Sequence, residues 1–181
     1  KHHDELSITK VHRVVKYKKG PALFGNKLKK RLHFLLEHVD TVMKDSKVDY
    51  VIQSGTLLGA WRHHGFIPWD GDVDVMITDN SLPILEKYLS TIDNDNIIWI
   101  FRTGLHSDII PIKVVDKKTG YYLDIDMCFI KNNICSYRWG VQIIHKALDY
   151  PLTDLFPSRA CLFDHLEVQC PRNPISVLKI Q

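Results

Sequence analysis

Three aspartates, Asp70, Asp72 and Asp74, occupy every second position in the stretch WDGDVDVMI. Because side chains alternate across a β-strand, a strand through this stretch puts all three carboxylates on one face. Neighbouring like charges repel and destabilise a sheet unless a cation lies among them. Carboxylate oxygens suit hard ions, so the spacing predicts a site for Mg²⁺ or Mn²⁺. The alternative is a solvated acidic strand edge, which usually carries scattered charges rather than an alternating row.

A second feature lies just upstream of the aspartates. The apolar run 50–53 predicts a short strand, residues 57–62 predict one or two helical turns, and Ser54, Gly55 and Thr56 connect them. A small, glycine-containing turn at a helix N-terminus leaves backbone N–H groups free to bind a phosphate. The order of these segments therefore predicts a phosphate-binding turn beside the metal site.

These motifs carry a resemblance to a known family. The stretch GTLLGAWRHHGFIPWDGDVDV (residues 55–75) resembles the signature of LicD-type transferases, which belong to the nucleotidyltransferase superfamily. LicD-type sequences commonly have an acidic residue where Gly71 stands, a position that points away from the predicted carboxylate face. Residues 113–125, KVVDKKTGYYLDI, resemble a second segment, and residues 154–181 resemble a third that contains a hairpin and a closing helix.

The resemblance implies a role for each candidate site residue. It makes Asp124 the third catalytic carboxylate, whereas Asp126 has no clear counterpart. The alternative for Asp124 is a hairpin charge paired with Lys113. The implied catalytic residues are Asp72, Asp74 and Asp124, the implied metal ligands are the same three with Asp70, and the implied nucleotide- or phosphate-binding residues are Ser54, Gly55, Thr56, Arg62 and Lys113.

The resemblance also implies a reaction. LicD-type enzymes transfer a phospho-alcohol group, such as phosphocholine or ribitol phosphate, from a CDP conjugate to a glycan hydroxyl and release CMP. The expected partners are therefore a CDP-activated donor and a glycan acceptor, with no nucleic acid. Two alternatives remain open: a strict nucleotidyltransferase that uses an NTP, and a non-catalytic binding module with the same fold.

Composition and patterning indicate the domain organisation. The chain has 181 residues, of which 45% are hydrophobic, enough to bury a core without staples. Residues 1–50 contain 12 Lys and Arg against 6 Asp and Glu. We expect a basic, extended arm over residues 1–24 and a catalytic domain over residues 25–181, truncated at its C-terminal end. No apolar run is long enough to span a membrane, so membrane contact is expected only through an anchor missing from this sequence.

The expected fold is α/β (α+β), a nucleotidyltransferase-like mixed β-sheet with flanking helices. Apolar residues at three- and four-residue intervals predict a helix from about Lys27 to Lys44, capped by Asn26. Ser81 is expected to cap a second helix over 82–89. Strands are expected over 97–101 and 109–115, with an antiparallel return over 121–130.

The four cysteines have no zinc-finger spacing, and two of them suggest a disulfide. A hairpin turn at Lys131-Asn132 would place Cys128 opposite Cys135. Cys161 and Cys170 are expected to be poor partners, because a turn at 164–165 sets Cys161 opposite Val168. A Cys128–Cys135 bridge would favour an oxidising compartment, the Golgi lumen in a eukaryote, over the cytoplasm.

Overall fold

The computed structural model describes residues 25–93, 96–101, 112–139 and 146–181. Its main sheet has the order β1-β2-β5-β4-β3, and β6 and β7 extend it from β5. The strands are β1 (Tyr50–Ile52), β2 (Asp74–Thr78), β3 (Ile97–Ile100), β4 (Ile112–Asp116), β5 (Tyr122–Lys131), β6 (Ile134–Trp139) and β7 (Lys146–Pro151). The β2–β5 pair is parallel and the other pairs are antiparallel, so the predicted mixed sheet is confirmed.

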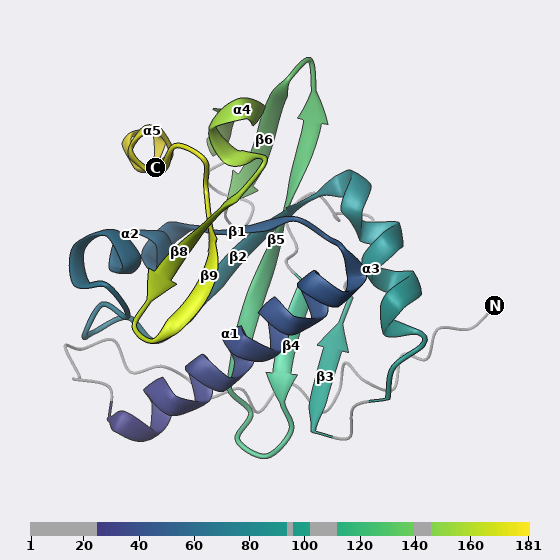
Figure 1. Ribbon diagram of the computed structural model, residues 1–181, viewed down its shortest axis with the longest axis vertical. Helices are drawn as coiled ribbons and strands as arrows, with labels where there is room; N and C mark the ends of the chain where they lie inside the picture. Colours follow the sequence, from purple (N-terminus) through teal and green to yellow (C-terminus); the bar gives the residue numbers. More distant parts are fainter. Residues whose placement is uncertain (1–24, 94–95, 102–111, 140–145) are drawn as a thin grey trace.

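Helices lie against this sheet, and a separate hairpin completes the fold (Figure 1). The helices are α1 (Asn26–Ser46), α2 (Ser54–His63), the 3₁₀ turn η3 (Asp79–Ser81), α3 (Leu82–Leu89), α4 (Leu152–Leu155) and α5 (Pro174–Ile180), and the hairpin strands are β8 (Arg159–Phe163) and β9 (Leu166–Cys170). The predicted basic arm, residues 1–24, lies outside the described residues. Among the described residues, no helix combines the length and the apolar character needed to cross a bilayer.

Helix α1 covers β4 and β5 and supplies much of the core (Figure 1). Its buried face includes Leu32, Leu35, Leu36 and Val39, which recur at the three- and four-residue spacing of an amphipathic helix. The predicted cap is wrong by one residue, because Gly25 holds the N-cap position and no side chain caps the helix. The span of α3 is as expected, but the hydroxyl of Ser81 lies within hydrogen-bonding distance of the Thr78 hydroxyl and does not cap the helix.

The predicted aspartate strand is shorter in the structure than in the sequence pattern. Strand β2 begins at Asp74, so Asp70 and Asp72 precede it in an irregular segment, and the expectation of three carboxylates on one strand is wrong. The reason is a turn in which the Asp70 N–H donates a hydrogen bond to the Ile67 carbonyl at 3.0 Å. Parallel pairing with β5 starts only at Asp74, which lies beside Asp124.

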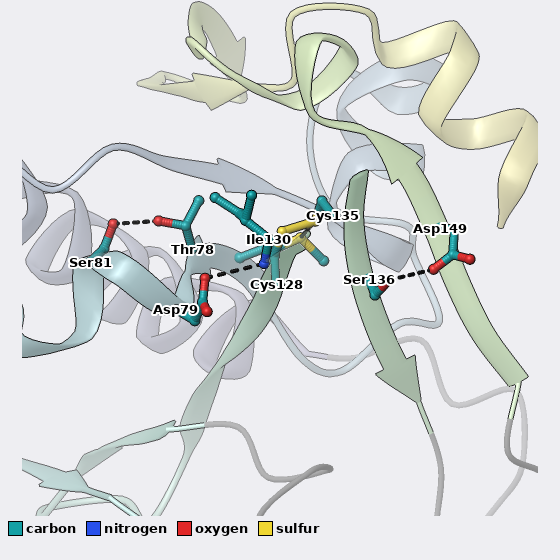
Figure 2. Close-up of a disulfide and its surroundings, with 9 residues drawn as sticks. Thr78, Asp79, Ser81, Cys128, Ile130, Cys135, Ser136 and Asp149 are labelled. Carbon is teal, nitrogen blue, oxygen red and sulfur yellow. Dashed lines mark hydrogen bonds between the residues drawn. A yellow bond between two sulfur atoms is a disulfide. The ribbon is translucent and has the colours of Figure 1, made fainter. Parts of the chain in front are cut away.

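The β5–β6 hairpin turns one residue later than the sequence suggested. Asn132 and Asn133 form the turn with φ of 51° and 61°, as a type I′ turn requires. The expected pairing of Cys128 opposite Cys135 is therefore wrong, since Cys135 lies opposite Ile130. The two cysteines are diagonal neighbours on one face, with Cα atoms 5.3 Å apart, and they still form the predicted disulfide (Figure 2).

The second pair of cysteines also forms a disulfide, against expectation. The β8–β9 register sets Cys161 opposite Val168, as predicted from the turn at 164–165. Cys170 lies two positions further along the same face, and its Cα is 5.8 Å from that of Cys161. Diagonal neighbours approach closely in a twisted two-stranded ribbon, a possibility that opposite-pair reasoning excludes. All four cysteines are therefore paired.

Candidate functional site

The site is built around the start of helix α2, which follows β1 directly. Helix α2 begins at Ser54, so the three residues predicted as a turn form its first turn. Ser54 adopts a left-handed backbone conformation with φ of 50°, which is uncommon for a residue other than glycine. The carboxylate of Asp70 occupies the space that a Cβ on Gly55 would need. Only a glycine at position 55 allows a carboxylate to lie so close to this helix N-terminus.

Backbone and hydroxyl groups fix the start of strand β2 against α2. The Gln53 N–H donates to the Asp74 carbonyl at 3.1 Å, and the Asp74 N–H donates to the Thr56 hydroxyl at 2.9 Å. Thr56 is buried, and its hydroxyl already accepts the hydrogen bond from the Asp74 N–H. On the other side of β2, the Asp124 N–H donates to the Val73 carbonyl at 2.9 Å. These bonds hold Asp74 and Asp124 side by side on adjacent parallel strands.

Burial and neighbouring negative charges raise the pKa values of Asp74 and Asp70. Burial, followed by the charges of Asp72, Asp126, Asp124 and Asp70, raises the pKa of Asp74 to about 9. Burial, followed by a hydrogen bond and charge repulsion from Asp72, raises the pKa of Asp70 to about 7. The structure thus brings the three predicted aspartates and Asp124 into one electrostatic cluster, although only two of these four lie on strands.

Lys113 is the cation paired with this cluster. Its Nζ donates to Oδ1 of Asp124 at 2.6 Å and lies 3.8 Å from the centre of the Tyr122 ring. Both partners are mostly buried, with side-chain exposures of 16% and 19%. The hairpin ion pair considered as an alternative role for Asp124 is therefore present. It does not remove Asp124 from the carboxylate cluster, since the charge of Asp124 still raises the pKa of Asp74.

A buried polar network extends the cluster along β5. Asp126 is 7% exposed, and its carboxylate accepts hydrogen bonds from Gln53 Nε2 and from the Tyr137 side chain. Burial is the main cause that raises the pKa of Asp126 to about 7. Burial, then the charge of Asp126, raises the pKa of Tyr137. Sequence reasoning gave no role to Gln53 or Tyr137; the only available signal for Gln53 was its polar side chain at the end of the predicted strand 50–53.

A cavity of about 610 Å³ lies next to this network. Its lining residues are Ser54, Leu58, Arg62, Tyr137, Leu148, Leu178 and Gln181. Two predicted phosphate-binding residues, Ser54 and Arg62, therefore share one cavity wall, and Tyr137 connects that cavity to Asp126. The structure places Lys113 away from this wall, on β4 beside Asp124.

The donor set fits a hard cation chemically. The oxygen atoms of the cluster belong to aspartate carboxylates, which are the ligands that hard cations prefer. Gln53, which is 1% exposed, adds an Oε1 atom that has no hydrogen-bond partner. Burial, followed by the charges of the neighbouring aspartates, raises the pKa of Asp74 to about 9, and a bound cation would relieve the repulsion between these charges. Within the described ranges, however, no three His, Cys, Asp or Glu side chains already converge as ligands around one point. The cluster has the ligand chemistry without a closed coordination shell.

Comparison with known proteins identifies the class and then the family. The mixed sheet with its flanking helices and clustered carboxylates is that of a nucleotidyltransferase-type domain, as predicted. Residues 47–173, most of the chain, match the family model described as LicD/FKTN/FKRP, nucleotidyltransferase domain. The chain belongs to this family, which confirms the resemblance.

Individual relatives differ in how much of the chain they match. An uncharacterized protein of Rickettsia prowazekii (strain Madrid E) is 28% identical over 152 residues, 83% of this chain and 53% of the relative. One of Rickettsia typhi (strain ATCC VR-144 / Wilmington) is 27% identical over 168 residues, 83% of this chain and 45% of the relative. The chain thus spans about half the length of these relatives. The lipopolysaccharide cholinephosphotransferase LicD of Haemophilus influenzae is 46% identical over 41 residues, 23% of this chain and 16% of that enzyme.

Two solved structures overlap more loosely with the chain. ANT(2″)-Ia in complex with adenylyl-2″-tobramycin has a TM-score of 0.46 and 11% identity, covering 81% of this chain and 70% of that one. The CdnC:HORMA-deltaN complex of E. coli MS115-1 has a TM-score of 0.38 and 13% identity, covering 83% of this chain and 48% of that one.

Proposed function

We propose that this protein is a metal-dependent transferase that moves a phospho-alcohol group from a CDP-activated donor to a glycan hydroxyl and releases CMP. The observation that carries the proposal is the pairing of Asp74 with Asp124 on adjacent parallel strands, inside a cluster of acidic side chains at the start of α2. Family membership and the short match to the cholinephosphotransferase of Haemophilus influenzae support the reaction class.

In this proposal Asp72, Asp74 and Asp124, with Asp70 as an auxiliary ligand, hold Mg²⁺ or Mn²⁺. The bound metal supplies positive charge that offsets the anionic pyrophosphate of the donor. The N-terminus of α2, with Ser54, Gly55 and Thr56, binds donor phosphate through backbone N–H groups. Arg62 and Lys113 add positive charge at the edges of the site. The Asp70 carboxylate lies against Gly55 at the same helix end. In this proposal it moves aside when a donor phosphate binds there.

The transfer itself is a displacement at phosphorus. The acceptor hydroxyl oxygen attacks the phosphorus that carries the alcohol, and a new P–O bond to the glycan forms. The bond between that phosphorus and the bridging oxygen breaks, and CMP leaves with the bridging oxygen and its electron pair. The acceptor proton passes to the carboxylate of Asp124. Lys113, which donates to Asp124 at 2.6 Å, keeps that carboxylate in position.

A donor screen tests the proposal. The protein is incubated with CDP-choline or CDP-ribitol in Mg²⁺, with and without a glycan acceptor, and CMP release is measured; Asp72→Asn is the inactive control. CMP release that requires Asp72 supports the proposal. Release of pyrophosphate from CTP or ATP would instead favour a strict nucleotidyltransferase. Neither release with any donor would favour a binding module, and both of these results would overturn the proposal.

The proposed setting is the lumen of an oxidising compartment, the Golgi if the source is eukaryotic. The support is that two disulfides use all four cysteines, and disulfides persist mainly in oxidising compartments. Glycan acceptors at a membrane would require an anchoring segment outside the described residues.

A further inference from the structure

The cavity beside the carboxylates is formed by three parts of the fold. Ser54, Leu58 and Arg62 stand at intervals of four on α2 and therefore share one face of that helix. Tyr137 comes from β6, Leu148 from β7 and Leu178 from α5. Figure 1 shows α5 next to the end of the molecule that carries α2, and the two helices are in contact. The closing helix thus completes the cavity.

The cavity has the size and lining of a small-molecule site. Pockets for such ligands are typically about 300–1,000 Å³, with apolar walls and a few polar groups that fix orientation. This cavity is about 610 Å³, and its lining residues include three leucines together with the polar residues Ser54 and Tyr137. Arg62 is its charged lining residue.

Two contacts connect the cavity to the carboxylate cluster. Ser54 immediately precedes Gly55, against which the Asp70 carboxylate lies. Tyr137 hydrogen-bonds to Asp126, which follows Asp124 on the same face of β5. A ligand whose phosphates lie at the start of α2 would therefore extend into this cavity with the group attached to those phosphates.

We propose that this cavity binds the nucleoside of a nucleoside-diphosphate donor, an inference that rests on the proposed function. A flat base with two apolar faces can bury its surface against Leu58, Leu148 and Leu178, while a polyhydroxylated alcohol or glycan would lose water there without sufficient hydrogen-bond partners. Ser54 and Tyr137 bring hydroxyl-bearing side chains to the lining; Tyr137 donates its proton to Asp126, so its oxygen is left as an acceptor for the ribose or the base edge. Arg62 supplies the charge for the nearer phosphate.

Calorimetric titration of the full chain with CDP, and with inorganic pyrophosphate as a phosphate-only probe, tests the inference. Leu178→Trp should fill the cavity and weaken CDP binding by at least about tenfold, a loss of 1.4 kcal/mol. Pyrophosphate binding should not change. Ile175→Trp is the matched control, because Ile175 is 48% exposed on the same helix and does not line the cavity. Leu148→Phe gives a second, smaller obstruction if the tryptophan variant does not fold.

Three results would overturn the inference: equal CDP affinity in a folded Leu178→Trp or Leu148→Phe variant, a parallel loss of pyrophosphate binding, or wild-type CDP affinity no higher than that for pyrophosphate. These outcomes separate from those of the donor screen. If the protein releases CMP but Leu178→Trp does not change its affinity for CDP, the inference about the cavity is wrong and the proposed reaction stands. If Leu178→Trp weakens CDP binding but no CMP is released, the cavity binds the nucleoside and the proposed reaction is wrong.

Discussion

The carboxylate of Asp70 fills the space beside Gly55 that a Cβ would need, so the helix N-terminus and the first acidic residue of the cluster fit together only without a side chain at position 55. Gly55→Ala should therefore displace Asp70 and lower the free energy of unfolding by about 1–3 kcal/mol, the usual cost of overpacking. Denaturant unfolding measures this loss, and transfer activity should fall with it.

A double-mutant cycle isolates the contact between these two residues. Asp70→Ala in the Gly55→Ala background should recover most of the lost stability, because the shorter side chain leaves room for the added methyl group. Gly25→Ala is the control, since a Cβ at Gly25 meets no atom within 4 Å. Additive effects of the two substitutions would contradict the steric explanation.

Removing charge from the cluster should separate activity from stability. Asp74→Asn is expected to lower transfer by about 100-fold or more, the scale of losing one preorganised electrostatic group. The same change should leave the free energy of unfolding equal or raise it, because a neutral amide removes the cost that burial and neighbouring charges impose on an ionised Asp74, the cost that raises its pKa to about 9.

Three further Asp→Asn variants serve as comparisons for Asp74→Asn. Asp72→Asn should behave like Asp74→Asn, and Asp70→Asn should lose less activity. Asp93→Asn, at an exposed position after α3, is the control for loss of one negative charge and should change neither property. A fall in melting temperature together with activity in Asp74→Asn would indicate a structural role for that carboxylate.

Much of the sheet could be predicted from sequence because its strands are short apolar runs between clear turns. The return strand after Asp116 and the helix 82–89 are where periodicity placed them. The errors arose where tertiary contacts override periodicity. Period-two aspartates predict a strand from Asp70, but close packing against Gly55 and the Ile67 turn hold Asp70 outside it.

The candidate site was predictable only in part, for a similar reason. Asp74 and Asp124 lie in strands, and their spacing together with the family resemblance predicts that they lie close to each other. Gln53, which follows β1, and Tyr137, on β6, reach the site because β1 pairs with β2 and β6 pairs with β5; the only local signal was the polar side chain of Gln53 at the end of the predicted strand. The cavity depends on α5 contacting α2, a long-range relationship that residue spacing does not encode.

Thiol titration tests both disulfides. The denatured, unreduced protein should show no free thiols and the reduced protein four, because Cys128–Cys135 and Cys161–Cys170 use all four cysteines. Cys161→Ser with Cys170→Ser should leave none, and Cys128→Ser alone should expose one. Four free thiols before reduction would contradict both bridges and remove the support for an oxidising compartment.

The loss of folding stability as the pH falls below neutral should depend on His33. Its Nε2 lies 2.8 Å from Oδ2 of Asp164, and its ring packs edge-on against Phe66 with centroids 4.9 Å apart. Burial is the largest effect on His33 and lowers its pKa below 6.5, although the hydrogen bond and charge of Asp164 act in the opposite direction. The unfolded chain therefore binds a proton at His33 more readily than the folded chain does.

The sign of the effect follows from this difference. The contribution of His33 to stability is fully present above pH 6.5 and is lost as the pH falls through the lower pKa of the folded state. Melting temperatures measured from about pH 7.5 to about pH 5 should therefore decline less steeply in His33→Gln, which keeps a side chain able to bond Asp164 but cannot be protonated. His63→Gln, on the exposed end of α2, should retain the wild-type decline. An unchanged slope in His33→Gln would show that other groups set the acid limit of the fold.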